Sequence, residues 1–177
     1  PQQFDSDGIN VQQFWTTSAD GERIPYFHVG KNAAPDTPTL VYAYGGFGVP
    51  ELPHYLGSIG KYWLEEGNAF VLANIRGGGE FGPRWHQAAQ GISKHKSVDD
   101  LLAVVRDLSE RGMSSPKHIG LQGGSNGGLI TAAAFVREPQ SIGALVCEVP
   151  LTDMIRYPLL SAGSSWTDEY GNPQKYE

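Results

Sequence analysis

The sequence has little of several things on which whole classes of protein depend. Its single cysteine, Cys147, excludes a disulfide framework and a cysteine metal cluster. The 13 lysines and arginines are outnumbered by 19 aspartates and glutamates, and this net charge of −6 argues against a nucleic-acid binder, which needs a basic face. No apolar run reaches the ~18 residues that a membrane-spanning helix requires. A hydrophobic fraction of 40% over 177 residues is typical of one globular domain.

Other signals are absent as well. No repeat or linker divides the chain, and no cofactor is implied. No metal site is indicated, because no two histidines stand at ligand spacing with a carboxylate nearby. Cys147 lies in an apolar run and is expected in the core. No signal peptide is visible, but a leader could precede the sequence, so cytoplasmic and periplasmic locations both stay open.

Strand and helix patterns alternate from Thr39 onward, which predicts an α/β fold with a mostly parallel sheet and helices on both faces. Before them a hairpin is expected at a sheet edge, where Pro25 is tolerated. Ser97 is expected to cap the longest helix and Gly112 to end it. Strands are predicted at 11–17, 23–29, 39–44, 69–74, 118–122 and 142–149, and helices at 59–66, 97–111 and 126–136.

The stretch 121–128, Leu-Gln-Gly-Gly-Ser-Asn-Gly-Gly, contains Gly-x-Ser-x-Gly between a predicted strand and a predicted helix. This is the setting of a nucleophile elbow, a sharp turn that presents a serine. Gly123 and Gly127 flank Ser125 because side chains there would collide with the strand and the helix. Ser125 is therefore a candidate nucleophile, and the backbone N–H of Asn126 is a candidate oxyanion donor. The alternative is a glycine-rich turn that only permits close packing.

A second oxyanion donor is expected from the loop after an earlier strand, and residues 44–48 are the candidate. Tyr44 closes a buried strand, so its hydroxyl could reach the crevice at the carboxyl end of the sheet, where open α/β folds bind ligands. On residue type alone, a core tyrosine bonded to a backbone carbonyl is the favoured interpretation.

The stretch 77–82 satisfies Gly-x-Gly-x-x-Gly after a strand, with Asp99 and Asp100 placed for a ribose contact, which raises a dinucleotide-binding hypothesis. Pro83 follows the third glycine at once, where that motif needs a helix, and a loop is expected to continue past Gly91. Earlier strands also precede the motif, which belongs to the first strand of its unit. The hypothesis is therefore disfavoured.

Four motifs occur together in one order: 44–47 (Tyr-Gly-Gly-Phe), 74–82 (Asn-Ile-Arg-Gly-Gly-Gly-Glu-Phe-Gly), the elbow, and 165–171 (Ser-Trp-Thr-Asp-Glu-Tyr-Gly). In this order and approximate spacing, nearly the whole chain resembles the catalytic domain of the prolyl oligopeptidase family of serine peptidases. The resemblance implies an α/β-hydrolase fold and hydrolysis of short peptides after proline through an acyl-enzyme.

The resemblance also implies roles for individual residues. Ser125 is then the nucleophile, and the Asn126 N–H and the Tyr44 hydroxyl are the two oxyanion donors. Trp166 stacks on the substrate proline, and a flat apolar ring against an indole face is a sound way to select proline. Phe47 and Tyr170 line the same pocket.

The triad of this fold runs Ser, Asp, His along the chain, yet all five histidines precede Ser125. His86 and His95 are disfavoured as bases, because neither matches the family's catalytic position. Asp153 and Asp168 follow the serine but are expected to be a loop-capping residue and a pocket-loop residue.

Residues 1–177 are therefore expected to form a partial catalytic domain, without the family's propeller and without its C-terminal strands and helices. We expect the chain alone to be inactive or nearly so. We also expect it either to be marginally stable or to self-associate through the unpaired edge of its last strand. Two alternatives stay open: an esterase or acyl-peptide hydrolase on the same fold, and a non-catalytic interaction domain that keeps the elbow geometry.

Overall fold

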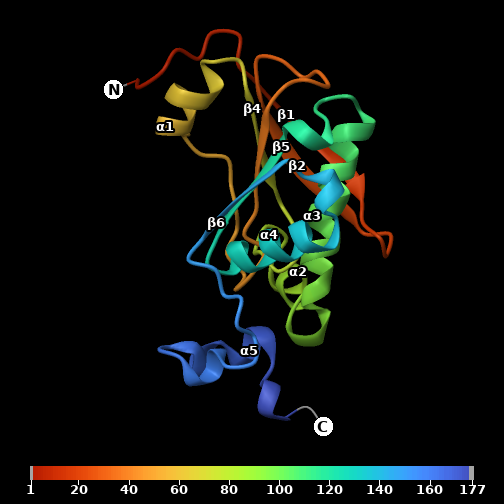
Figure 1. The fold of residues 1–177 in the computed structure, drawn as a ribbon, viewed down its shortest axis with the longest axis vertical. Helices are drawn as coiled ribbons and strands as arrows, with labels where there is room; N and C mark the ends of the chain where they lie inside the picture. The colour runs from red at the N-terminus through yellow and green to blue at the C-terminus, as the bar shows by residue number, and fades with distance from the viewer. Residues whose placement is uncertain (1, 176–177) are drawn as a thin grey trace.

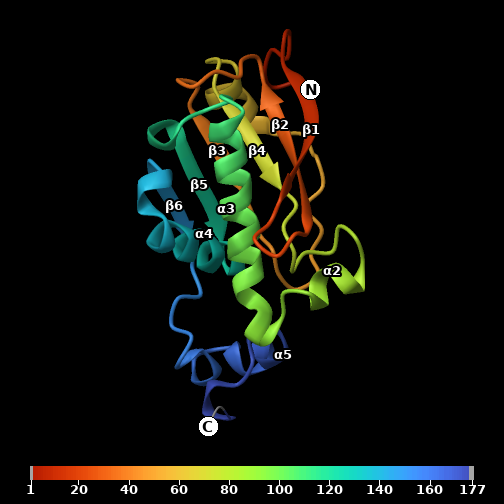
Figure 2. The same cartoon turned by 90° about the vertical axis from the view of Figure 1, so that its right-hand side faces the viewer.

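The computed structural model describes residues 2–175, which form one six-stranded sheet with helices on both faces (Figure 1). The strands are β1 (Asn10–Thr17), β2 (Arg23–Gly30), β3 (Thr39–Tyr42), β4 (Ala69–Ala73), β5 (Ile119–Gly124) and β6 (Ala144–Glu148). Their order in the sheet is β1-β2-β4-β3-β5-β6 (Figure 2). The first two pairings are antiparallel and the remaining three are parallel, so the sheet is mixed with a parallel core.

Helices connect the parallel strands, and short helical turns follow the last of them. The α-helices are α1 (Gly57–Ile59), α2 (Pro83–Gln87), α3 (His95–Glu110), α4 (Asn126–Arg137) and α5 (Thr167–Tyr170). A π-helical turn, η1 (Gly60–Leu64), continues α1. The 3₁₀ turns are η2 (Gly91–Lys94), η3 (Pro116–His118), η4 (Pro139–Ser141), η5 (Tyr157–Leu159), η6 (Gly163–Trp166) and η7 (Pro173–Lys175).

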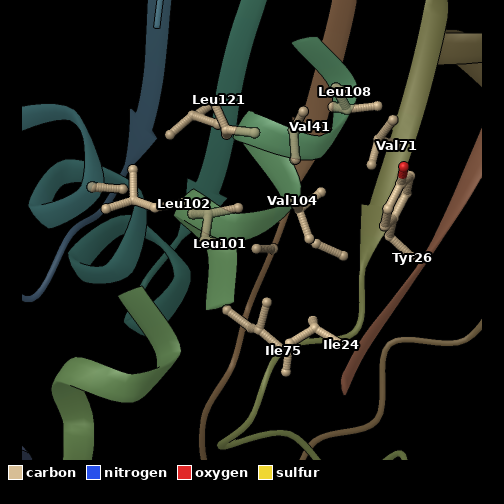
Figure 3. Packing of buried hydrophobic residues seen from close by; sticks show 14 of the residues in the cluster. Ile24, Tyr26, Val41, Val71, Ile75, Leu101, Leu102, Val104, Leu108 and Leu121 are labelled. Carbon is tan, nitrogen blue, oxygen red and sulfur yellow. The ribbon is translucent and has the colours of Figure 1, made fainter. Parts of the chain in front are cut away.

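The pleat of the sheet divides the apolar side chains into two cores. The larger core lies under α3, whose apolar stripe packs on Val41, Val71 and Leu121 (Figure 3). Alternate residues of β4, Phe70 and Leu72, face the opposite side and pack beneath α1 and η1. Because both faces are covered, β4 is a continuous apolar run buried at every position.

The structure confirms the predicted strands and long helices within a few residues, and it corrects five local expectations. Ser97 does not cap α3; its hydroxyl donates to the carbonyls of Arg76 and Gly45. The expected loop after Pro83 contains α2, and the predicted helix 59–66 is largely a π-helical turn. Cys147 is half-buried on β6 rather than in the core. Pro25 lies on β2, an inner strand, just beyond the end of the β2–β4 ladder.

A buried ion-pair network fastens the edge hairpin to the rest of the domain. The Arg76 guanidinium, 4% exposed, donates to both carboxylate oxygens of Asp100 on α3 and to both of Asp20 in the β1–β2 turn. These hydrogen bonds from Arg76 lower the pKa of Asp20 to about 2. The loop after β4 is thereby fixed between the hairpin and α3.

The part of the chain that the structure describes has neither a candidate membrane span nor a candidate metal-binding cluster. Among residues 2–175, no helix is both long and apolar enough to cross a bilayer. The same residues hold no group of three or more histidine, cysteine, aspartate or glutamate side chains arranged to bind a metal ion.

Candidate active site

Ser125 occupies a strained turn between the end of β5 and the start of α4. Its backbone has φ 54° and ψ −118°, a region that non-glycine residues rarely adopt. Its N–H donates to the Glu148 carbonyl on β6 at 2.9 Å, and its own carbonyl accepts the Leu129 N–H at 3.1 Å. No hydrogen bond to the Ser125 hydroxyl is found within residues 2–175. The turn therefore presents a free hydroxyl at the carboxyl edge of the sheet.

The two glycines beside Ser125 are required by close backbone contacts. A Cβ on Gly123 would lie 2.3 Å from the Gly127 carbonyl oxygen, and one on Gly127 would lie 2.5 Å from the Ala43 carbonyl oxygen. Real Cβ atoms do not approach backbone this closely. The elbow is thus pressed against the strand end that carries Tyr44, as the flanking glycines in the sequence predict.

Asn126 joins three parts of the site. As the first residue of α4, its N–H has no acceptor within the helix and is available to a developing anion. Its fully buried side chain donates from Nδ2 to the Tyr44 carbonyl at 2.6 Å, and its Oδ1 accepts the Tyr170 hydroxyl at 2.8 Å. The elbow, the loop after β3 and α5 are held together at this one side chain.

Tyr44 lies just beyond the end of β3, where the sequence predicts the second oxyanion donor. Its hydroxyl makes no hydrogen bond within the described residues, so it is not the carbonyl-bonded core tyrosine that residue type favours. Burial, followed by the negative charges of Glu169 and Glu51, raises the pKa of Tyr44 above its ordinary value. The hydroxyl therefore stays protonated and able to donate at neutral pH.

The glycine-rich stretch 77–82 packs against the loop that follows Tyr44. A Cβ on Gly77 would lie 2.2 Å from the Gly45 carbonyl oxygen, and one on Gly79 would lie 2.1 Å from that of Gly48. The glycines allow two loops to touch through their backbones. This packing accounts for Gly77 and Gly79 without a nucleotide, and Gly82 has a positive φ of 80°.

Aromatic side chains from two distant segments meet beside the elbow. The Phe47 and Tyr170 rings form an edge-to-face pair with centroids 5.7 Å apart and planes at 83°. Tyr157 also packs edge-to-face with Tyr170, with a centroid distance of 5.5 Å. The structure brings these rings together. It gives half-buried Trp166, the last residue of η6, no ring contact within residues 2–175.

A charged cluster behind the aromatic pair was not found from the sequence. Glu169, 3% exposed, accepts hydrogen bonds from His86 Nε2 at 2.6 Å and from Lys94 Nζ at 2.5 Å. It also accepts the backbone N–H of Phe47 at 3.1 Å. The one signal in the sequence is that Glu169 precedes Tyr170 within the 165–171 motif, whereas His86 and Lys94 stand outside every motif.

None of the five histidines hydrogen-bonds to Ser125 in the described part of the chain. The ring of His86 is engaged by Glu169, and that of His95 contacts the Ile92 carbonyl. Asp153 accepts the Arg156 N–H and pairs with its guanidinium, as expected of a loop-capping residue. Within residues 2–175, Ser125 is therefore presented without a histidine hydrogen-bonded to it.

The comparison with protein families decides what this arrangement belongs to. The model of the prolyl oligopeptidase family matches residues 56–177, which is most of the chain. The chain belongs to this family. The members of this family are serine peptidases. The fold of the chain is that of their α/β-hydrolase catalytic domain. The resemblance drawn from the four motifs is therefore confirmed.

Relatives of the chain are similar along nearly all of it. An uncharacterized peptidase of Sinorhizobium fredii is 47% identical over 98% of the chain and 24% of its own length. A prolyl endopeptidase of Elizabethkingia meningoseptica is 32% identical over 97% of the chain and 24% of its own length. The structure of a post-proline cleaving enzyme from Rickettsia typhi superposes with a TM-score of 0.95 at 45% identity, covering 98% of this chain and 26% of that one. The chain spans about a quarter of the length of the proteins that it matches.

Proposed function

We propose that this chain supplies the nucleophile, the oxyanion hole and the proline pocket of a serine peptidase that cleaves short peptides after proline. The observation that carries the proposal is the Asn126 side chain, which ties the strained Ser125 turn to both the Tyr44 carbonyl and the Tyr170 hydroxyl. These two hydrogen bonds of one residue fix the position of the nucleophile relative to an anion donor and an aromatic pocket. The names of the Elizabethkingia and Rickettsia relatives support the same substrate class.

In the proposed reaction the Ser125 Oγ attacks the carbonyl carbon of the residue before the scissile bond, and its proton passes to a base. The negative charge that develops on the carbonyl oxygen is met by the Asn126 N–H and the Tyr44 hydroxyl. When this intermediate collapses, the scissile C–N bond breaks, and the base passes the serine proton to the leaving amine. Water then hydrolyses the acyl-enzyme that remains on Ser125. None of the histidines hydrogen-bonds to Ser125 in the described residues, so the proposal assigns the base to a part of the protein outside this sequence.

The test uses the product of the complete reading frame with a fluorogenic Gly-Pro amide. Wild type is expected to turn it over, Ser125→Ala to lose turnover, and a fluorophosphonate to label wild type alone. Absence of labelling would instead favour a non-catalytic interaction domain. Trp166→Ala is expected to reduce the preference for proline over alanine at the cleaved position, and an unchanged preference would favour an esterase or acyl-peptide hydrolase.

The 177-residue chain on its own is expected to be nearly inactive on the same amide. Without a base, an oxyanion hole and binding alone retain a rate of ~10³–10⁴-fold over water, far below a complete triad. Turnover by the isolated chain at ordinary peptidase rates, abolished by Ser125→Ala, would contradict this expectation.

A further inference from the structure

The Glu169–Lys94 ion pair holds the loop that follows β3 from both sides. Glu169 Oε1 accepts the Phe47 N–H at 3.1 Å, while Lys94 Nζ donates to the Gly45 carbonyl at 3.1 Å. The two charged groups are 2.5 Å apart and almost wholly buried, with side-chain exposures of 3% and 13%. Figure 2 shows α5, which carries Glu169, beside the N-terminal end of α3. The turn that carries Lys94, η2, immediately precedes α3 in the chain.

The loop needs such support, because its backbone is strained at Phe47. Gly45, Phe47 and Gly48 all have positive φ, of 63°, 55° and 63°. For Phe47 this conformation costs free energy and persists only where neighbouring groups fix it. The loop begins at Tyr44 and contains Phe47, so its shape sets where the hydroxyl donor and the aromatic wall lie.

We infer that Glu169, acting through its ion pair with Lys94, is a positioning residue that holds Tyr44 and Phe47 in place for the reaction. It touches neither Ser125 nor, in the proposed geometry, the reacting carbonyl; it acts through the loop backbone. The inference rests on the proposed function, since it assigns Glu169 a part in that site.

The ionised form of Glu169 is the form that can do this. Burial opposes the charge, but the Lys94 ammonium and the hydrogen bonds from His86, Lys94 and the Phe47 N–H outweigh it and hold the pKa of Glu169 below its ordinary value. As a carboxylate it accepts from three donors at once, whereas a glutamine amide replaces one oxygen by a donor. The Lys94 ammonium also lies 5.6 Å from the centre of the Tyr170 ring, which adds to its attraction for this position.

The test is Glu169→Gln in the product of the complete reading frame, assayed with the Gly-Pro amide. We expect kcat to fall about 10- to 100-fold, because a displaced anion donor is lost mainly in the transition state. The decisive readout is coupling: in a Tyr44→Phe background the same change is expected to cost less than about threefold further, since the donor that it displaces is already absent. A general effect on folding would cost the same in both backgrounds.

Glu138→Gln is the matched control, because this partly buried carboxylate pairs with Arg106 away from the site and should leave kcat unchanged. Glu169→Asp keeps the carboxylate charge but shortens the side chain by one methylene. It replaces Glu169→Gln if the glutamine variant melts below the assay temperature. The same coupling to Tyr44→Phe is expected for it. Unchanged kcat in the folded variant, or equal losses in both backgrounds, would overturn the inference. Wild type that cleaves another amide but not one after proline would refute the proposed specificity alone, and Glu169→Gln is then tested on that amide.

Discussion

At the scale of single residues, Ser125 concentrates strain where chemistry is proposed. A backbone conformation of this kind costs on the order of 1–3 kcal/mol and has to be maintained by its surroundings. Here the hydrogen bond to Glu148 and the first turn of α4 maintain it. The glycines on either side make the turn possible, because they leave no side chain between the strand, the turn and the helix.

The requirement for glycine predicts different outcomes at two positions of β5. At Gly123 an added methyl group would meet backbone at 2.3 Å, whereas at Gly120 its nearest neighbour would be 3.7 Å away. Gly123→Ala is expected to lower the free energy of unfolding by more than about 2 kcal/mol and to stop fluorophosphonate labelling of Ser125. Gly120→Ala should change stability by less than about 0.5 kcal/mol. Urea unfolding of the complete gene product measures both, and equal effects would contradict the contact argument.

A second residue-scale prediction concerns the Tyr44 hydroxyl. Tyr44→Phe is expected to lower kcat for the Gly-Pro amide by about 10²–10³-fold, the usual loss for one oxyanion donor. Because the raised pKa keeps the neutral hydroxyl present as pH rises, the ratio of wild-type to variant kcat should stay constant from about pH 6 to about pH 9. A ratio that falls within this range would show that the donor ionises there. Tyr62→Phe, at an exposed position, is the control and should have no effect.

At the scale of elements, local pattern was sufficient where burial follows periodicity. The apolar stripe of α3 and the continuous run of β4 predict their own structure, because each side chain faces a core. The local sequence pattern did not predict α2, because contacts with a distant part of the loop hold this helix in place. The Trp85 carbonyl accepts the Gly77 N–H, and the Trp85 indole donates to the Ile75 carbonyl. The cap expected of Ser97 failed because its hydroxyl is used by the loop after β4.

The same distinction applies to the candidate site. Ser125 and Asn126 lie within one short motif, so their spacing alone predicts a candidate nucleophile and a candidate oxyanion donor. Glu169 meets His86 and Lys94 across 83 and 75 positions of the chain. No periodicity marks such a contact, because each of the three side chains, taken separately, is ordinary for a protein surface. Only the fold brings them together.

The Arg76 network carries a prediction about how elements are joined. Arg76→Met leaves the fully buried carboxylate of Asp100 without its partner, and we expect a loss of about 3–5 kcal/mol in the free energy of unfolding. The matched control is Arg137→Met, which breaks the adjacent but exposed pair with Asp99 and should cost less than about 1 kcal/mol. Denaturant unfolding measures both, and similar losses for the two variants would contradict the assigned role of burial.

At the scale of the whole molecule, the two faces of the sheet are covered unequally. α3 and α4 lie over one face, whereas α1 and η1 cover only the other face near β4 (Figure 2). Beyond them, an apolar hollow of about 360 Å³ opens over β3, β5 and β6, lined by Leu40, Trp63, Ala144 and Val146. Within residues 2–175, β6 also pairs on one side only.

An open apolar face beside an unpaired strand edge predicts how the isolated 177-residue chain behaves. We expect it to self-associate at micromolar concentration, because unpaired N–H and C=O groups and uncovered apolar surface both favour contact with another copy. Val146→Lys places a charge in the hollow, where 47% of Val146 is exposed, and should shift sedimentation towards monomer. Val136→Lys, on the outer face of α4, adds the same charge elsewhere and should not. A monodisperse wild-type monomer with a cooperative melt would show that this edge does not drive association.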